Sequence, residues 1–301
     1  MSLLDSAIVR LLPAVPKPVV RRLSSRYIAE PRLDDAVRVV QSLNGEGKLA
    51  TIDVLGEEIA DEAAAAAIVQ AYEDVFTEIE RRGLDSNVSV KPTGLGLELG
   101  YDVCRANLEH VVAHAAESGN FVRIDMEDSS TTDATLALYR ELREAGYENL
   151  GVVLQASLRR TLDDVRALAD LRPSVRLCKG IYIEPPDIQF RDYEQVRASF
   201  VQALDALLEC GAYVAIATHD EWLVEQALPR VTGLARTEYE FQMLLGVRPE
   251  LGDRLVAEGH RLRIYVPFGD QWYRYSLRRL QENPAIAGAV ARDTIGRLLP
   301  L

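Results

Sequence analysis

The feature that most constrains the fold is an alternation in the chain: from about residue 48, short β-rich runs are each followed by a longer helical stretch. Parallel strands that alternate with helices over roughly 250 residues suit a closed barrel of eight units. We therefore expect a (β/α)8 barrel over residues 46–301, preceded by an N-terminal helical arm at residues 1–45, with the last helix capping the active site. The expected strands are residues 49–57, 87–91, 121–127, 151–156, 175–180, 213–218, 239–242 and 262–267.

The main competing fold is a doubly wound open sheet that binds a dinucleotide. Such a sheet favours a GxGxxG pattern directly after its first strand. The nearest pattern here, Gly94, Gly96 and Gly100, has the wrong final spacing and follows the second expected strand. We interpret it as a loop that leads into a helix, and the barrel remains the favoured fold.

Composition excludes several classes of protein. The chain has 34 Lys and Arg against 46 Asp and Glu, a net charge of −12. General nucleic-acid binding needs a basic surface, so we expect no nucleic-acid partner. The three cysteines, Cys104, Cys178 and Cys210, are widely spaced and form no CxxC pair. That spacing argues against a disulfide scaffold or a zinc finger, and it suits a reducing, cytoplasmic compartment without a bound metal.

The first 27 residues are apolar but carry one acid and five basic side chains. Arg10 and Pro13 interrupt any signal-peptide core, and no run of the chain approaches the ~20 apolar residues that span a bilayer. Two interpretations stay open. The segment forms short helices that pack on the barrel, or it is also a peripheral contact with anionic lipid at the inner face of the cell membrane.

Polar residues stand at the ends of most expected strands. In a barrel these ends meet around one axis and form the active site. Solvated loops explain one or two such residues, but they explain a whole converging set less well. The residues are Asp53 or Glu57, Lys91, Asp125 with Glu127, Gln155, Lys179, Thr218 with His219, Glu240 with Gln242, and Tyr265.

The third expected strand places Arg123, Asp125 and Glu127 on one face by simple alternation. A charged face inside a barrel is costly unless its charges are paired or used.

The last expected helix, residues 270–284, carries two opposite stripes. One is apolar, and the other holds Tyr275, Arg278, Arg279 and Glu282 at helical spacing. Two adjacent guanidinium groups beside an aromatic ring would suit a small carboxylate attached to a ring, because Arg binds carboxylates bidentately. A solvated helix face with an Arg–Glu pair is the plain alternative.

At these residues the chain resembles the proline dehydrogenases, a flavin-dependent family of (β/α)8 enzymes, in their short monofunctional bacterial form. The resemblance is a series of motifs in the family order, spread over residues 89–283. They are Ser89–Lys91, Ile124–Glu127, Leu154–Ala156, Arg176–Gly180 with Tyr182, Ala217–His219, Glu240–Gly246, Tyr265–Gly269 and Arg278–Glu282.

The resemblance implies an activity and a cofactor. L-proline would be oxidised to 1-pyrroline-5-carboxylate, the first step of proline catabolism to glutamate, by hydride transfer from C5 to N5 of a non-covalent FAD. The electrons would then pass to a quinone.

The resemblance also assigns roles to residues. Asp125, Arg176 and Tyr182 would be catalytic, with Asp125 also holding Lys91. Proline would contact Lys91, Leu244, Tyr265, Tyr275, Arg278, Arg279 and Glu282. The flavin would contact Met126, Gln155, Arg176, Lys179, Gly180, Ile181, Thr218 and His219.

Several positions depart from the family pattern, and Pro92–Thr93 interrupts the usual run after Lys91. Ile181 replaces the usual Ala, Ser157 replaces a common Tyr, and Asp220 replaces the usual Asn and adds negative charge near the flavin. Two other functions stay open on the same fold. One is a Schiff-base lyase with Lys91 or Lys179 as nucleophile, and the other is a non-catalytic barrel that binds a small carboxylate or a partner.

Overall fold

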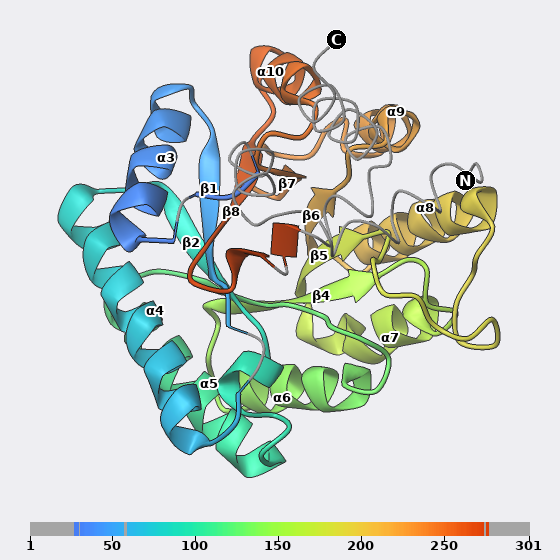
Figure 1. The fold of residues 1–301 in the computed structure, drawn as a ribbon. Coiled ribbons are helices and arrows are strands. Elements are labelled where there is room, and N and C mark those ends of the chain that lie inside the picture. Colours follow the sequence, from blue (N-terminus) through green and yellow to red (C-terminus); the bar gives the residue numbers. More distant parts are fainter. Residues whose placement is uncertain (1–26, 30, 57–58, 274, 277–301) are drawn as a thin grey trace, which may run out of the picture.

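The computed structural model describes residues 27–29, 31–56, 59–273 and 275–276. Its strands form one closed, all-parallel barrel in chain order (Figure 1). The strands are β1 (Leu49–Val54), β2 (Ser86–Val90), β3 (Val122–Ile124), β4 (Leu150–Gln155), β5 (Ser174–Cys178), β6 (Tyr213–Ala217), β7 (Tyr239–Leu244) and β8 (Leu262–Phe268). Each lies within or closely overlaps an expected run, so the predicted (β/α)8 fold is confirmed.

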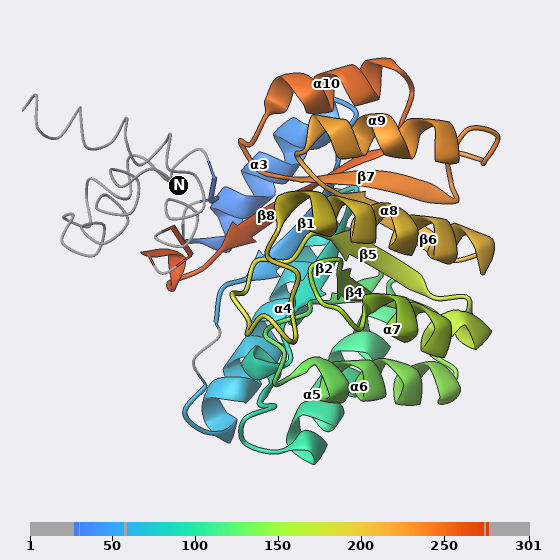
Figure 2. The ribbon, with the colours of Figure 1, turned by 90° about the vertical axis from the view of Figure 1, so that its right-hand side faces the viewer.

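Helices cover the outside of the barrel, as the side view in Figure 2 shows. Those that follow β1 to β7 are α4 (Glu62–Arg82), α5 (Tyr101–Glu117), α6 (Thr132–Glu144), α7 (Thr161–Leu168), α8 (Tyr193–Glu209), α9 (Glu221–Arg230) and α10 (Pro249–Ala257). Short 3-10 turns, η2 (Thr93–Leu95) and η3 (Ala169–Leu171), precede α5 and follow α7. The glycine-rich segment at 94–100 thus holds a turn and a helix start, as expected.

The helix α3 (Leu33–Gly45) precedes the barrel in sequence but belongs to its outer layer. It packs against β1 and β8, where the two ends of the sheet meet. Its buried residues Ala36, Val37, Val40 and Leu43 recur at helical spacing and join the main hydrophobic core. The boundary between arm and barrel at residue 45 stays a prediction, because residues 1–26 lie outside the described part of the chain.

Helix α4 shows how local sequence sets these elements. The Asp61 side chain accepts a hydrogen bond from the backbone N–H of Ala64 and caps the first turn. Gly83 ends the helix in the left-handed conformation, at φ 60°. Between them an apolar stripe, which includes the fully buried Tyr72 and Val75, faces the strands.

The barrel interior holds charged side chains that contact ionic or polar partners. Near the N-terminal end, Arg263 Nε lies 2.8 Å from Glu240 Oε1, and Arg123 donates to the carbonyl of Ser174 at 2.7 Å. The strand β3 ends at Ile124, so Glu127 lies beyond it, where it accepts hydrogen bonds from Thr93. The charged face expected from residues 121–127 is therefore shared between the barrel floor and the loop above β3.

Candidate active site

Cavities of similar size open at the two ends of the barrel. The one at the N-terminal strand ends, about 670 Å³, is lined by residues such as Leu49, Ser86 and Tyr213. The other, about 680 Å³, lies at the C-terminal ends. Barrel enzymes place their chemistry at the C-terminal ends, where loops can vary without disturbing the strands. The second cavity is therefore the candidate active site.

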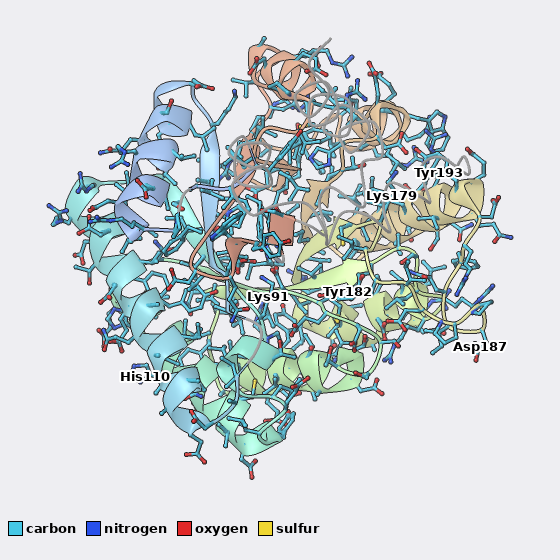
Figure 3. All side chains as sticks on the ribbon, in the orientation of Figure 1. Lys91, His110, Lys179, Tyr182, Asp187 and Tyr193 are labelled. Carbon is cyan, nitrogen blue, oxygen red and sulfur yellow. The ribbon has the colours of Figure 1, made fainter. Side chains whose placement is uncertain are left out.

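This cavity gathers every predicted site residue that falls in the described part of the chain. In Figure 3, Lys91 and Tyr182 lie near the barrel axis, with Lys179 and Tyr193 further out toward α8. The residues brought together are Lys91, Asp125, Met126, Gln155, Arg176, Lys179, Gly180, Ile181, Tyr182, Thr218, His219, Leu244, Tyr265 and Tyr275. Arg278, Arg279 and Glu282 lie outside the described residues, so their carboxylate clamp stays a prediction.

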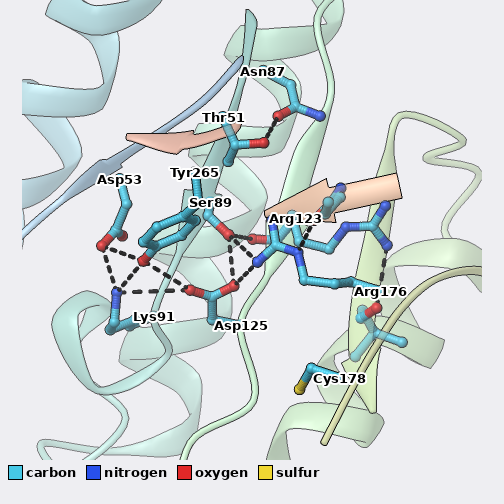
Figure 4. A network of polar contacts seen from close by, with 12 residues as sticks. Thr51, Asp53, Asn87, Ser89, Lys91, Arg123, Asp125, Arg176, Cys178 and Tyr265 are labelled. Carbon is cyan, nitrogen blue, oxygen red and sulfur yellow. Dashed lines mark hydrogen bonds and ion pairs between the residues drawn. The ribbon is translucent and has the colours of Figure 1, made fainter. Parts of the chain in front are cut away.

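One wall of the cavity is a buried ion pair between Asp125 and Arg176 (Figure 4). Arg176 Nη1 lies 2.6 Å from Asp125 Oδ1, which also accepts from the Ser89 hydroxyl at 2.6 Å. Arg176 Nε donates to Gln242 Oε1 at 2.5 Å, and the Gln242 amide in turn donates to Glu240. A chain of hydrogen bonds therefore runs from the cavity down into the barrel and fixes the guanidinium plane.

Lys91 pairs with a different carboxylate from the one expected. Its Nζ lies 2.7 Å from Asp53 Oδ2 but 3.7 Å from Asp125 Oδ2, so Asp53 is the main partner of Lys91. Asp53 also accepts from the Tyr265 hydroxyl at 2.6 Å. The expectation that Asp125 holds Lys91 is thus corrected in part: β1 and β3 both flank β2, and Asp125 is the second, more distant partner.

Burial and charge act in opposite directions on this pair. Burial raises the pKa of Asp53 above its ordinary value, and the Lys91 ammonium opposes that rise. For Lys91, burial lowers the pKa, but the neighbouring Asp53, Tyr265 and Asp125 outweigh it and the pKa is raised well above its ordinary value. Lys91 is therefore held as a cation.

The opposite wall holds Lys179 and the acidic residue Asp220. Asp220 accepts from Lys179 Nζ at 2.9 Å, from the Tyr193 hydroxyl at 2.6 Å and from Arg197 Nη2 at 2.8 Å. Burial alone would raise the pKa of Asp220, but these donors hold it well below its ordinary value. The negative charge that Asp220 adds to this wall is thus compensated by two adjacent cations.

Gly180 also lines the cavity. Gly180 has φ +101°, and a Cβ built there would lie 2.3 Å from Ser157 Oγ and 2.9 Å from Gln155 Oε1. Gln155 is fixed by its own hydrogen bond to the Glu127 carbonyl at 2.7 Å. Only a glycine fits here, and the small Ser157, which departs from the family pattern, is packed against it.

His219 joins two strand ends. Its Nε2 accepts a hydrogen bond from the backbone N–H of Leu244 at 2.8 Å, so β6 and β7 are tied together where they reach the cavity.

Within the described residues, no group of three or more His, Cys, Asp or Glu side chains is arranged to hold a metal ion. In the same part of the chain, no helix has both the length and the apolar character needed to cross a membrane.

Asp53 is the functional residue that sequence reasoning named only as a strand end. The signal for it was its place as the last polar residue of β1, in alternation with Thr51. Sequence alone did not separate it from Glu57, which lies outside the described residues.

The fold and the cavity define a (β/α)8 enzyme with a charged pocket at the C-terminal ends of its strands. The sequence profile described as "Proline dehydrogenase" matches residues 36–292. The chain belongs to the proline dehydrogenase family, and it is an oxidoreductase of proline catabolism.

The similarity to curated relatives extends over most of the chain. "Proline dehydrogenase 1" of Bacillus subtilis (strain 168) is 36% identical over 272 residues, which cover 90% of both chains. "Proline dehydrogenase" of Deinococcus radiodurans is 35% identical over 279 residues, 91% of this chain and 90% of that one. The matching lengths agree with the monofunctional bacterial form that the motifs predicted.

Solved structures share the fold at lower identity. Proline utilization A from Bdellovibrio bacteriovorus, inactivated by N-propargylglycine, matches with a TM-score of 0.82 at 23% identity. The match covers 92% of this chain and 36% of that protein. Proline utilization A from Corynebacterium freiburgense matches with a TM-score of 0.76 at 20% identity, over 98% of this chain and 34% of that protein. This chain therefore spans about a third of those proteins.

Proposed function

We propose that the cavity binds L-proline beside a non-covalent FAD and that the protein oxidises the proline to 1-pyrroline-5-carboxylate, with a quinone as electron acceptor. The observation that carries this proposal is the convergence of two polar walls on one cavity. Lys91, Asp125 and Arg176 form one wall, and Gln155, Lys179 and Thr218 lie on the other side.

The residues of the second wall fit a flavin. The bare Gly180 backbone allows a flat ring system to approach closely, and Gln155 is oriented to present its Oε1. Lys179 and Arg176 supply positive charge, which would favour the anionic reduced flavin. When bound, FAD would supply the electron sink for the hydride from C5 of proline.

The first wall fits the polar groups of proline. Lys91, with the predicted Arg278 and Arg279, would bind the carboxylate, which is the most directional handle on this substrate. Tyr265, with Tyr275 and Leu244, would enclose the ring methylenes. This arrangement would hold the reacting carbon in one orientation.

Asp125 is placed to orient the amine. Its Oδ1 is taken by Arg176 and Ser89, while Oδ2 lies 3.5 Å from the Tyr265 hydroxyl and 3.7 Å from Lys91 Nζ. Oδ2 is thus only weakly engaged and would accept a hydrogen bond from the substrate nitrogen. Hydride loss requires the neutral amine, and the cations Lys91 and Arg176 favour its deprotonation.

A Schiff-base lyase fits this site less well. A nucleophilic lysine needs a lowered pKa, whereas the pKa of Lys91 is raised by the carboxylates around it. Lys179 is paired with Asp220. Both lysines are paired with a carboxylate, which favours the charged ammonium over the neutral, nucleophilic amine.

The colour of the protein tests the proposal. Freshly purified protein should be yellow, should release FAD on mild denaturation, and should lose its visible absorption when L-proline is added without air. Borohydride should not inactivate it in the presence of proline. A colourless protein, a released FMN, or a flavin that proline leaves oxidised would contradict the proposal.

A lipid-soluble quinone would also require the protein to reach a membrane surface. We propose that the basic, apolar residues 1–26 supply part of that contact. Removing this segment should abolish sedimentation with anionic vesicles but leave proline oxidation with a water-soluble acceptor intact. In the intact protein, sedimentation should fall steeply with salt. Unchanged vesicle binding with a lower melting temperature would instead show that the segment only packs on the barrel.

A further inference from the structure

Asp53 contacts two side chains that line the cavity without lining it itself. Its side chain is fully buried, with 0% of its surface exposed. One oxygen, Oδ2, accepts from Lys91 Nζ at 2.7 Å and from the Tyr265 hydroxyl at 2.6 Å. Lys91 and Tyr265 both line the cavity, and Asp53 does not. Any effect of Asp53 on a ligand must therefore pass through these two side chains.

The barrel topology explains how one carboxylate reaches both. The strand β1 pairs with β2 on one side and with β8 on the other. Lys91 directly follows β2, and Tyr265 lies on β8. In Figure 4 dashed lines join both side chains to Asp53 on one side and to Asp125 on the other.

Counted over the described residues, the hydrogen bonds of Lys91 leave one donor for a ligand. An ammonium has three N–H groups. One is directed to Asp53, and one lies 3.2 Å from the Tyr265 oxygen, which can accept because its own proton goes to Asp53. The third is left on the side of Asp125 Oδ2, at 3.7 Å. That donor is available to an incoming carboxylate.

A buried ammonium on a flexible side chain keeps one position only when its partners fix it. In the described part of the chain, the charged or titratable groups that act most strongly on Lys91 are Asp53, Tyr265, Asp125 and Tyr72. The Tyr72 hydroxyl donates to the Ser89 carbonyl at 2.6 Å, so its proton is already used. Asp53 is therefore the nearest counter-ion of Lys91, and its side chain is fully buried.

We propose that Asp53 is a positioning residue for substrate recognition, which fixes Lys91 and Tyr265 so that the remaining Lys91 donor meets the carboxylate of the substrate. The inference rests on the proposed function, because it takes the ligand to be a cyclic amino-acid carboxylate. Asp53 itself would touch neither the substrate nor the cofactor.

The test replaces Asp53 by Asn, which keeps the shape and removes the charge. Binding of cyclopentanecarboxylate, which has the ring and carboxylate of proline but no amine to oxidise, is measured by calorimetry on the holoenzyme. Asp53→Asn should weaken binding by ~10-fold or more at neutral pH, because Lys91 loses its fixed position. The loss should grow as pH rises, since Lys91 without Asp53 gives up its proton at a lower pH. KM for proline should rise more than kcat falls.

Two further variants separate positioning from simple structural damage. Asp164→Asn removes another largely buried carboxylate, paired with Arg160 on α7 and away from the cavity, and should leave binding unchanged. In a Lys91→Met background, adding Asp53→Asn should weaken binding only slightly, because only the Tyr265 contact is left to lose. This comparison leaves no unpaired lysine, so it is decisive even where Asp53→Asn alone does not fold.

The outcomes distinguish the inference from the proposed function. A parent protein that oxidises proline, with an Asp53→Asn variant of the same affinity and pH profile, overturns the inference and leaves the function standing. An equal loss on adding Asp53→Asn to Lys91→Met also overturns it, because Asp53 would then act by another route. A parent protein that does not oxidise proline overturns the proposed function, whatever Asp53 does in the calorimeter.

Discussion

Replacing Arg176 by Met should lower kcat/KM for L-proline by ~10²–10³-fold and the free energy of unfolding by about 3–5 kcal/mol. Arg176 is the nearest cation to Asp125, with its Nη1 2.6 Å from Asp125 Oδ1, and both side chains are largely buried. Met fills a similar volume but leaves Asp125 with the Ser89 hydroxyl and a distant Lys91. The buried charge would then be poorly compensated, which costs more than the lost contact itself.

Steady-state kinetics with a water-soluble acceptor and unfolding by urea measure the two effects of Arg176→Met. Arg166→Met is the matched control, because Arg166 forms its ion pair with Asp163 on the exposed face of α7, where the two side chains are 73% and 79% exposed. That change should alter stability by less than about 0.5 kcal/mol and leave the kinetics as they are. Arg176→Met with the parent's kinetics would show that the Asp125–Arg176 pair is not part of the catalytic site.

The strands were predictable because short β-rich runs alternate regularly with longer helical stretches along the chain. The ends of the strands were harder to place. β3 was expected over residues 121–127 but spans only Val122–Ile124. Asp125 N–H still donates to the Val90 carbonyl at 2.8 Å, and the chain then turns away from the sheet. An alternating pattern does not show where a ladder of hydrogen bonds stops, because a loop can alternate as well.

The candidate site was predictable as a set but not in its pairings. Polar residues at strand ends must converge in a closed barrel, and that rule placed Lys91, Lys179 and Tyr265 around one cavity. Which carboxylate each cation meets depends on angstrom-scale differences between neighbouring strands. Asp53 and Asp125 both flank Lys91, and only the coordinates separate 2.7 Å from 3.7 Å.

The sequence patterns also could not predict which helix residues contact the site, as Asp220 shows. Asp220 was expected to add negative charge near the flavin, and the sequence patterns indicated no partner for it. Instead it meets Tyr193 and Arg197, which lie on the first turns of α8. More than 20 residues separate them from Asp220 in the chain, and no local periodicity connects the two segments.

Replacing Gly180 by Ala should weaken FAD binding by ~30-fold or more and leave purified protein with less flavin. Two causes act together. A left-handed φ of +101° is strained for Ala, and the added Cβ would lie 2.3 Å from Ser157 Oγ. Neither neighbour can move freely, because Ser157 Oγ accepts a hydrogen bond from Gln189 Nε2 at 3.0 Å and the Gln155 amide donates to the Glu127 carbonyl at 2.7 Å. The clash would therefore shift the wall that we propose holds the flavin.

The control variant Gly211→Ala separates the effect of backbone strain from the effect of the steric clash. Gly211 has φ +71°, and a Cβ there meets nothing within 4 Å, so this control carries strain without a clash. Both variants should lose about 1–3 kcal/mol of stability, but only Gly180→Ala should lose FAD affinity in a titration of the apoprotein. Adding Ser157→Ala to Gly180→Ala removes the closest contact and should restore part of the affinity. Equal FAD affinity in Gly180→Ala and Gly211→Ala would contradict this assignment. It would show that the flavin binds away from Gly180, since a shift of Ser157 and Gln155 would not affect the flavin site.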